Sequence, residues 1–339
     1  MNLFILNIIS YFLVFFSGYS FLKKFNIIDK PDHRKIHKVP TIKSAGILIF
    51  INFVICMKFF NIDPFLNKLI VTSFFIVLLG FIDDMVNLRP STKLISIIFL
   101  SYINLITLNI FNIDLGILKL IISREYTELI FSVMCLSLFI NSFNYIDGID
   151  GLASTMFTSS FVIMNLYLYY FNDYNYYNNL FLCIPLVIFL FFNFNFFSKS
   201  KMFMGDSGSL LLGFILGCFM LYSNSNKDID LNAFVIIWFG AYYIYDLLST
   251  SLIRLNENNK IFIPDQKHLH HILLIKYDKY KSLILCNLLN IFLILIGIYL
   301  FNIFGELISI IFFIILFFLF HIFKLNMIHI LKLNIKRKK

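Results

Sequence analysis

Long runs of apolar residues alternate with short polar stretches along the whole chain of 339 residues. The runs are of membrane-spanning length. A segment inside lipid must satisfy its own backbone hydrogen bonds, and a helix does so. The pattern therefore predicts an all-α, polytopic membrane protein with about 11 transmembrane helices. The runs fall near residues 3–22, 44–60, 68–82, 94–111, 128–143, 152–171, 179–197, 209–223, 231–253, 282–301 and 306–323.

The polar stretches on the two sides of the predicted membrane differ in charge. One set holds 23 of the chain's 28 Lys and Arg residues. Because basic loops stay on the cytoplasmic side, this set is predicted to be cytoplasmic, with the N-terminus outside and the C-terminus inside. The set comprises residues 23–43, 83–93, 141–151, 198–208, 254–281 and 324–339.

The chain is predicted to form a single integral-membrane domain over residues 1–339, because it contains no long linker and no convincing repeat. The first apolar run has no basic stretch before it and is followed by many more runs. It is therefore predicted to be a retained helix rather than a signal peptide.

Composition excludes a soluble domain. Hydrophobic residues make up 60% of the chain, charged residues 14%, and the mean hydropathy is +0.85. The net charge of +9 lies mostly in short loops, which favours anionic headgroups and substrates as partners and argues against nucleic acid. The five cysteines form no Cys-x-x-Cys pair, which argues against a disulfide framework and a thiolate zinc site.

Five carboxylates lie at the ends of apolar runs, on the predicted cytoplasmic side. Because a charge near hydrocarbon is costly, their recurrence there predicts a metal ion and a polyphosphate held at the membrane surface. The first two are expected at a helix C-terminus, where the helix dipole disfavours negative charge. A divalent cation, Lys93 or Arg89 is expected to compensate them. The five are Asp83, Asp84, Asp147, Asp150 and Asp206.

The third polar stretch places Asn141, Asn144, Asp147 and Asp150 at intervals of three. On a continuous helix these side chains would be scattered around the axis. The two glycines that follow the acids predict that the backbone opens here, so that both acids face one cavity. A polar helix terminus capped by asparagine is the alternative.

The segment from Met202 to Ser209 reads Met-Phe-Met-Gly-Asp-Ser-Gly-Ser and precedes an apolar run. The free N–H groups of a helix start favour phosphate, and Asp206 is a candidate ligand for Mg²⁺. A serine-hydrolase interpretation is disfavoured, because a helical membrane protein has no strand to carry the nucleophile.

Five of the seven histidines lie in two basic loops, which predicts that they bind an anion. Zinc is disfavoured, because no cysteine accompanies them and three of them cannot all point one way on a helix. The five are His33, His37, His268, His270 and His271. The other two, His321 and His329, are expected to be bystanders at the membrane interface.

Five motifs in matching order resemble those of a known family. They are Arg34-Lys35-x-His37-x-x-Pro40-Thr41, Asp83-Asp84, Asn141-x-x-Asn144-x-x-Asp147-Gly-x-Asp150-Gly-Leu152, Phe203-x-Gly205-Asp206-x-Gly208-Ser209 and His268-x-His270-His271. The chain resembles the polyprenyl-phosphate N-acetylhexosamine-1-phosphate transferases of the glycosyltransferase family 4 type. That family includes undecaprenyl-phosphate GlcNAc-1-phosphate transferase and phospho-MurNAc-pentapeptide translocase.

The resemblance implies a metal-dependent phosphoryl transfer from a UDP-N-acetylhexosamine to polyprenyl phosphate, with release of UMP. The implied cofactor is Mg²⁺, with Mn²⁺ as the alternative ion. The implied catalytic residues are Asp83, Asp84, Asp147, Asp150, His270 and His271. The implied substrate contacts are Lys35, His37, Lys43, Asn141, Asn144, His268 and Lys267. The implied metal ligands are Asp206 and Asp84.

The resemblance also implies a multi-pass protein of the inner membrane, with its active site facing the cytoplasm, that initiates a surface polysaccharide such as O-antigen or a teichoic acid. The resemblance is also compatible with a homodimer. Two departures stand out. Ala45-Gly46 replaces a Gly-Gly pair, and Gln266 stands where the family often has arginine, which leaves that role to Lys267.

Two alternatives to this function remain. One is the peptidoglycan translocase, which carries three consecutive histidines where this chain has His268-Leu-His-His. The other is a cation- or proton-coupled transporter, which would carry acids near the middle of the membrane in broken helices. The acids of this chain lie at the ends of the apolar runs instead.

Overall fold

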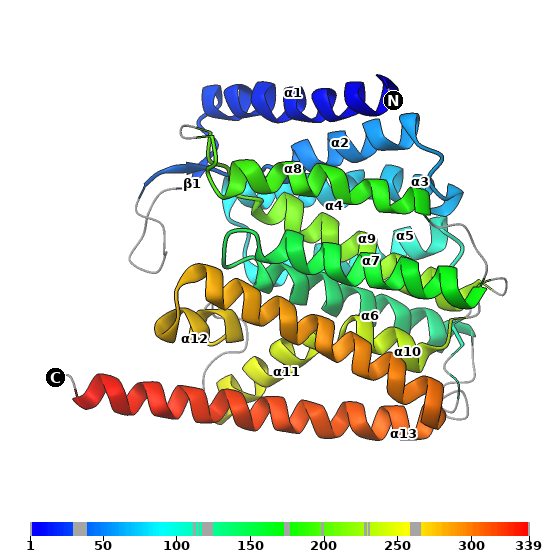
Figure 1. Ribbon diagram of the computed structural model, residues 1–339, viewed down its shortest axis with the longest axis vertical. Coiled ribbons are helices and arrows are strands. Elements are labelled where there is room, and N and C mark those ends of the chain that lie inside the picture. The colour runs from blue at the N-terminus through cyan, green and yellow to red at the C-terminus, as the bar shows by residue number, and fades with distance from the viewer. Residues whose placement is uncertain are drawn as a thin grey trace.

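The computed structural model describes residues 2–29, 39–110, 113–114, 116, 125–172, 177–197, 200–226, 229, 231–257 and 266–337. Nearly all of these residues are helical. Figure 1 shows the long helices lying side by side in one bundle, with the N- and C-termini at opposite ends. The elements are α1 Asn2–Lys24, β1 Ile28–Asp29, β2 Thr41–Ile42, α2 Gly46–Phe59, α3 Pro64–Thr72, α4 Phe74–Val86, α5 Pro90–Thr107, α6 Glu125–Ile146, α7 Leu152–Asn172, the 3₁₀ helix η2 Tyr177–Leu182, α8 Cys183–Asn193, α9 Gly205–Ser225, α10 Ala233–Phe239, α11 Ala241–Asn256, α12 Leu269–Lys276 and α13 Lys279–Arg337.

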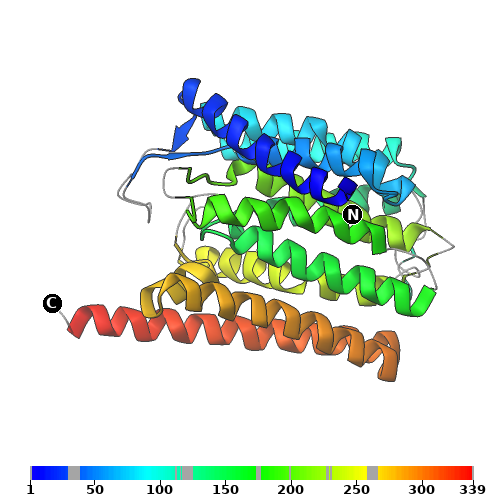
Figure 2. The same cartoon turned by 45° about the horizontal axis from the view of Figure 1, so that its top comes forward.

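The chain is a polytopic membrane protein, but fewer of its helices than predicted meet the length and composition of a span. Among the described residues, six helices do so, or seven if α10 and α11, which meet at 71°, form one broken span. The predicted runs 44–60 and 179–197 form shorter apolar helices. Ser, Thr and Asn residues dilute the apolar character of α7. The last two predicted runs are the arms of α13, which reverses at Gly305; Figure 2 shows these arms side by side.

A small sheet departs from the all-helical prediction. Strands β1 and β2 pair antiparallel, and Ile42 forms a parallel bridge to Met202. The backbone N–H of Phe203 donates to the carbonyl oxygen of Ile42 at 2.8 Å. These segments lie between helices, so their backbone groups need partners outside a helix. The pairing joins the first polar loop to the segment that precedes α9.

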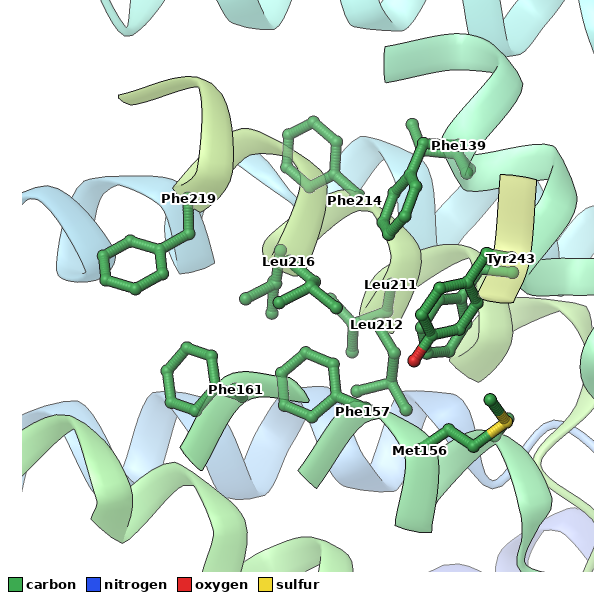
Figure 3. Packing of buried hydrophobic residues seen from close by; sticks show 14 of the residues in the cluster. Phe139, Met156, Phe157, Phe161, Leu211, Leu212, Phe214, Leu216, Phe219 and Tyr243 are labelled. Atoms are coloured by element: carbon green, nitrogen blue, oxygen red, sulfur yellow. The ribbon is translucent and has the colours of Figure 1, made fainter. Parts of the chain in front are cut away.

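Helix α9 lies inside the bundle and is the most deeply buried of the candidate spans. It packs against α2, α4, α6 and α7. Figure 3 shows Phe157 and Phe161 of α7 facing Leu212 and Leu216 of α9. A helix enclosed on all sides is expected to be apolar all round, and α9 is so from Leu210 to Leu221.

Helix α4 approaches the first turn of α9 closely because residue 80 is glycine. A Cβ atom at Gly80 would lie 2.5 Å from the carbonyl oxygen of Asp206 and 2.5 Å from the Cα atom of Ser207. Small residues allow helix backbones to approach in membranes. This contact places the end of α4, with its two aspartates, against the beginning of α9.

Gly80→Ala is expected to destabilise the protein by about 1–3 kcal/mol, because the new methyl group meets backbone atoms that cannot rotate away. The free energy of unfolding in a mild detergent measures this effect. Gly18→Ala is the matched control: its methyl group would meet the flexible Leu48 side chain, so a smaller loss is expected. An equal loss in both variants would contradict a specific α4–α9 contact.

Candidate active site

A polar cavity of about 580 Å³ opens among the polar segments at one end of the bundle. Its walls come from β1, the ends of α4 and α6, the start of α9, α12 and the start of α13. Seven residues singled out from the sequence line it. They are Lys43, Asp84, Asn144, Asp147, Asp150, Asp206 and His271.

The carboxylate of Asp84 caps the start of α9. Its Oδ1 accepts the N–H of Asp206 at 3.0 Å, and its Oδ2 accepts the N–H of Ser207 at 3.3 Å and the hydroxyl of Ser44 at 2.8 Å. Gly205 has φ 73°, and a Cβ there would lie 2.6 Å from Asp84 Oδ2. The prediction that these N–H groups face phosphate is therefore wrong for two of them, because a carboxylate of the chain already satisfies both.

Lys93 compensates the acids at the end of α4. It is one of the three groups that the sequence suggested for this role. Its Nζ lies 2.8 Å from Asp83 Oδ2, 3.2 Å from Asp206 Oδ2 and 2.8 Å from Asn144 Oδ1. The amide of Asn144 donates to Asp206 Oδ1 at 2.5 Å and to the hydroxyl of Ser209 at 2.7 Å. One ammonium group thus joins α4, α5, α6 and α9.

The backbone opens after α6, as the glycines predicted. Helix α6 ends at Ile146 and α7 begins at Leu152, so Asp147 and Asp150 lie on the connection and line the same cavity. Burial, together with the negative charges of Asp206, Asp150 and Asp84, raises the pKa of Asp147 well above its usual range. A carboxyl in this position gains a proton readily and favours a nearby cation.

Asp150 lies between two lysines. Lys201 Nζ is 2.7 Å from Asp150 Oδ2, and Lys279 also pairs with this oxygen. Both lysines line the cavity together with Lys43. Their ammonium groups give this wall of the cavity the positive charge that an anionic ligand needs.

The histidine segment, residues His268 to His271, lies against the connection between α6 and α7. A Cβ at Gly148 would be 2.2 Å from His270 Nε2, and both ring nitrogens of His270 are buried without a hydrogen-bond partner among the described residues. Burial, together with His271 and His268, lowers the pKa of His270 well below the usual range of histidine. His270 is therefore neutral at physiological pH, with one nitrogen able to donate and the other able to accept.

Other predicted site residues do not line the cavity. Asp83 bonds to Lys93 and to the N–H of Leu88 at 2.7 Å. Asn141 lies in α6, Lys267 pairs with Glu257, and His268 pairs with Asp246 at 2.7 Å. Lys35 and His37 lie outside the described residues.

The chain is similar in sequence to one protein family and to several curated proteins. Residues 66–224 match the family model described as glycosyl transferase family 4. A probable undecaprenyl-phosphate N-acetylglucosaminyl 1-phosphate transferase of Bacillus subtilis (strain 168) is 30% identical, over 73% of this chain and 70% of its own length. The undecaprenyl-phosphate alpha-N-acetylglucosaminyl 1-phosphate transferase of Yersinia pestis is 25% identical, over 81% of this chain and 77% of its own length. The protein of the same name from Escherichia coli (strain K12) is 25% identical, with coverages of 74% and 70%.

The chain belongs to glycosyl transferase family 4. The resemblance drawn from the five motifs is thereby confirmed. The family match includes all five carboxylates and ends before the histidine segment.

The cavity of this family 4 protein suits a cation shared with a substrate phosphate. Among the described residues, no three His, Cys, Asp or Glu side chains form a ready metal-binding group. Mg²⁺ is nevertheless commonly held by one or two carboxylates together with substrate phosphates and water. Asp84, Asp147 and Asp206 line one cavity, which fits that donor set.

Sequence reasoning missed three contributors to the cavity and its charge. Lys201 and Lys279 neutralise Asp150, and Asp29 of β1 lines the wall. Lys201 stands directly before the Met202–Ser209 motif, which was a usable signal. Lys279 follows α12 and had no local signal, because only the fold brings it to Asp150.

Lys93→Met is expected to lower the free energy of unfolding by about 1–3 kcal/mol, since two carboxylates lose a charged hydrogen-bond donor. Denaturation in detergent measures it. The control is Lys281→Met, because Lys281 is a surface residue, 70% exposed, at 3.3 Å from Asp278, and such a pair contributes about 0–1 kcal/mol. Equal losses would show that Lys93 is dispensable to the acid cluster.

The stability of the protein is expected to fall on acidification partly through His270. Its folded pKa lies below the unfolded value of about 6.5, so below that pH the unfolded state binds the proton first. The unfolding free energy then falls by up to about 1.4 kcal/mol per pH unit from this group. Asp147, with its raised pKa, contributes with the opposite sign.

The difference between wild type and His270→Gln isolates the histidine. Unfolding free energies measured from pH 7.5 to 5 should fall more steeply for the wild type. Parallel curves would contradict the lowered pKa.

Proposed function

We propose that this protein transfers an N-acetylhexosamine 1-phosphate from a UDP-amino sugar to undecaprenyl phosphate, releasing UMP. The observation that carries the proposal is the convergence of acids from four separate segments, three lysines and His271 on one cavity. The names of the relatives support it, since each names an undecaprenyl-phosphate sugar-1-phosphate transferase.

The charge pattern of the cavity suits the joining of two phosphate-bearing substrates. Lys43, Lys201 and Lys279 line it and can hold phosphate oxygens as point charges. Asp147 can bind or release a proton, because burial and the neighbouring negative charges raise its pKa above that of an exposed carboxyl. His271 lines the cavity and can bond diphosphate or sugar oxygens, and the buried ring of His270 packs against it with centroids 4.1 Å apart.

Asp206 and Asp84 would hold Mg²⁺ or Mn²⁺ at this site. The bound ion would neutralise charge on the diphosphate during transfer. Lys93 lies 3.2 Å from Asp206, so the chain itself supplies a cation next to one proposed ligand. The role of Lys93 is then to hold Asp83 and Asp206 in place, whatever the metal.

The cavity would face the cytoplasm of the inner membrane, where UDP-sugars are made. The count of basic residues supports this orientation. The cavity lies at the end of the bundle with the C-terminus, because β1 and α12 contribute to its walls and lie at that end (Figure 1).

Membranes carrying the protein are expected to exchange labelled UMP into a UDP-N-acetylhexosamine when given undecaprenyl phosphate and Mg²⁺. Assaying UDP-GlcNAc, UDP-GalNAc and the UDP-muramoyl-pentapeptide in parallel identifies the donor and separates this function from the peptidoglycan translocase. Absence of exchange with every donor, with solute uptake into proteoliposomes instead, would favour a transporter.

Asp206→Asn in the same assay should lower turnover by at least about 100-fold, because it removes one charge from the ion-binding site. Asp278→Asn is the control, since Asp278 is exposed and retains a cap for the start of α13. Both variants should purify as folded protein. Full activity in Asp206→Asn would remove this residue from the site.

A further inference from the structure

A buried lysine near the end of α13 lies far along the chain from the cavity and outside the five motifs. Lys324 is wholly buried. Its Nζ lies 2.6 Å from Asp246 Oδ1, 2.6 Å from Thr250 Oγ1 and 3.3 Å from the carbonyl oxygen of Asp246. The three protons of the ammonium group thus meet three acceptors of α11. A charged side chain within a membrane span is energetically costly, and such residues usually have a function.

Asp246 links this lysine to the histidine segment. Its Oδ1 accepts the N–H of Leu269 at 2.9 Å, and its Oδ2 bonds His268 Nδ1 at 2.7 Å. His268 precedes α12 but provides no side-chain cap of its own. A carboxylate from α11 therefore satisfies the free N–H at the start of α12, where the helix dipole favours negative charge.

The start of α12 carries His271, which lines the cavity, and the buried His270 beside it. His270 and His271 lie in its first turn, with His270 against Gly148 and His271 in the cavity wall. The ring of His268 stacks on Tyr145, with centroids 5.2 Å apart. A shift of the helix start would therefore move both imidazoles relative to the acids at 147 and 150.

The second arm of α13 is held to α10 and α11 along its length. Trp238 Nε1 donates to Ser309 Oγ at 2.9 Å, and Tyr245 donates to the carbonyl oxygen of Phe313 at 2.6 Å. His321, expected to be a bystander, bonds Ser249 at 2.9 Å. Figure 1 shows this arm running back to the end of the bundle where α12 lies. Of these contacts, the one at Lys324 reaches the histidine segment, through Asp246.

We propose that Lys324 and Asp246 are positioning residues, and that the C-terminal arm sets the place of the histidines in the active site through them. Lys324 places a counter-charge against the buried Asp246 carboxylate, and Asp246 fixes the start of α12. The effect on catalysis rests on the proposed transferase function. The effect on the histidine segment does not.

The test compares Lys324→Met with Ser309→Ala, which removes a different contact of the same arm. Amide hydrogen exchange by mass spectrometry is measured on full-length protein in detergent. Lys324→Met should speed exchange in residues 266–276 and leave α9 unchanged, whereas Ser309→Ala should leave residues 266–276 at the wild-type rate. Unchanged exchange in Lys324→Met, or equal loosening in both variants, would overturn the proposal.

Activity gives a second readout. Lys324→Met should lower kcat/KM for the UDP-sugar by about 10- to 100-fold, the usual cost of misplacing a contact group, while KM for undecaprenyl phosphate stays unchanged. In a His271→Ala background, Lys324→Met should cause little further loss of kcat/KM, because both substitutions act through the His271 imidazole. A full additional loss in that background would show a general structural role and overturn the proposal.

Lys324→Met leaves Asp246 without its counter-charge and can prevent folding. The double variant Asp246→Leu with Lys324→Met then carries the test, since it leaves no unpaired buried charge at this position. Leucine can neither accept the N–H of Leu269 nor bond His268, so faster exchange in residues 266–276 is again expected, and wild-type exchange again overturns the proposal. If the wild type transfers no sugar phosphate from any donor, the proposed function fails, while the exchange data still decide the positioning role.

Discussion

The cavity depends on a carboxylate at the end of one helix capping the start of another. Asp84 stands in the last turn of α4, where the helix dipole disfavours it, and receives two N–H groups from the first turn of α9. The unfavourable end of α4 and the unsatisfied start of α9 thus compensate each other. Gly80 permits the close approach. Asp206 takes its position from this contact, because it lies in the turn that Asp84 caps.

Charge compensation organises the rest of the site. Lys93 holds Asp83 and Asp206, and two lysines hold Asp150. Asp147 has no such ion pair in the part of the chain that the structure describes, and burial among other acids raises its pKa. The site therefore combines fixed, neutralised carboxylates with one whose protonation responds to a nearby cation or phosphate. That combination suits the proposed transfer between two phosphates.

The C-terminal arm gives the histidine segment a support that its own sequence lacks. The side chain of His268 does not cap α12, and the cap comes from α11 instead. The carboxylate that provides it is tied to Lys324. Groups that contact substrate need rigid support, because small displacements cost activity. Here the support comes from the part of the chain that lies outside the match to the family model.

The sequence by itself determined the class of the protein and most of the chemistry at its cavity. Apolar runs predicted a helical membrane protein, since lipid leaves a chain few other ways to satisfy its backbone. Four of the five acids at the ends of the runs line one cavity, and the high cost of a charge near hydrocarbon was the reason to expect them together. The sequence overestimated the number of full-length spans, because hydropathy does not show where a helix ends inside an apolar run: the runs 44–60 and 179–197 form shorter helices.

Only the tertiary structure decided which polar groups pair in hydrogen bonds and ion pairs. Local pattern suggested phosphate at the start of α9, yet Asp84 occupies two of its N–H groups from 122 residues away in the chain. Lys279, Asp246 and Lys324 had no readable role, because each finds its partner across more than 20 residues of chain. Hydrophobic patterning is a property of neighbouring residues, whereas the pairing of buried charges depends on where the packed helices bring them.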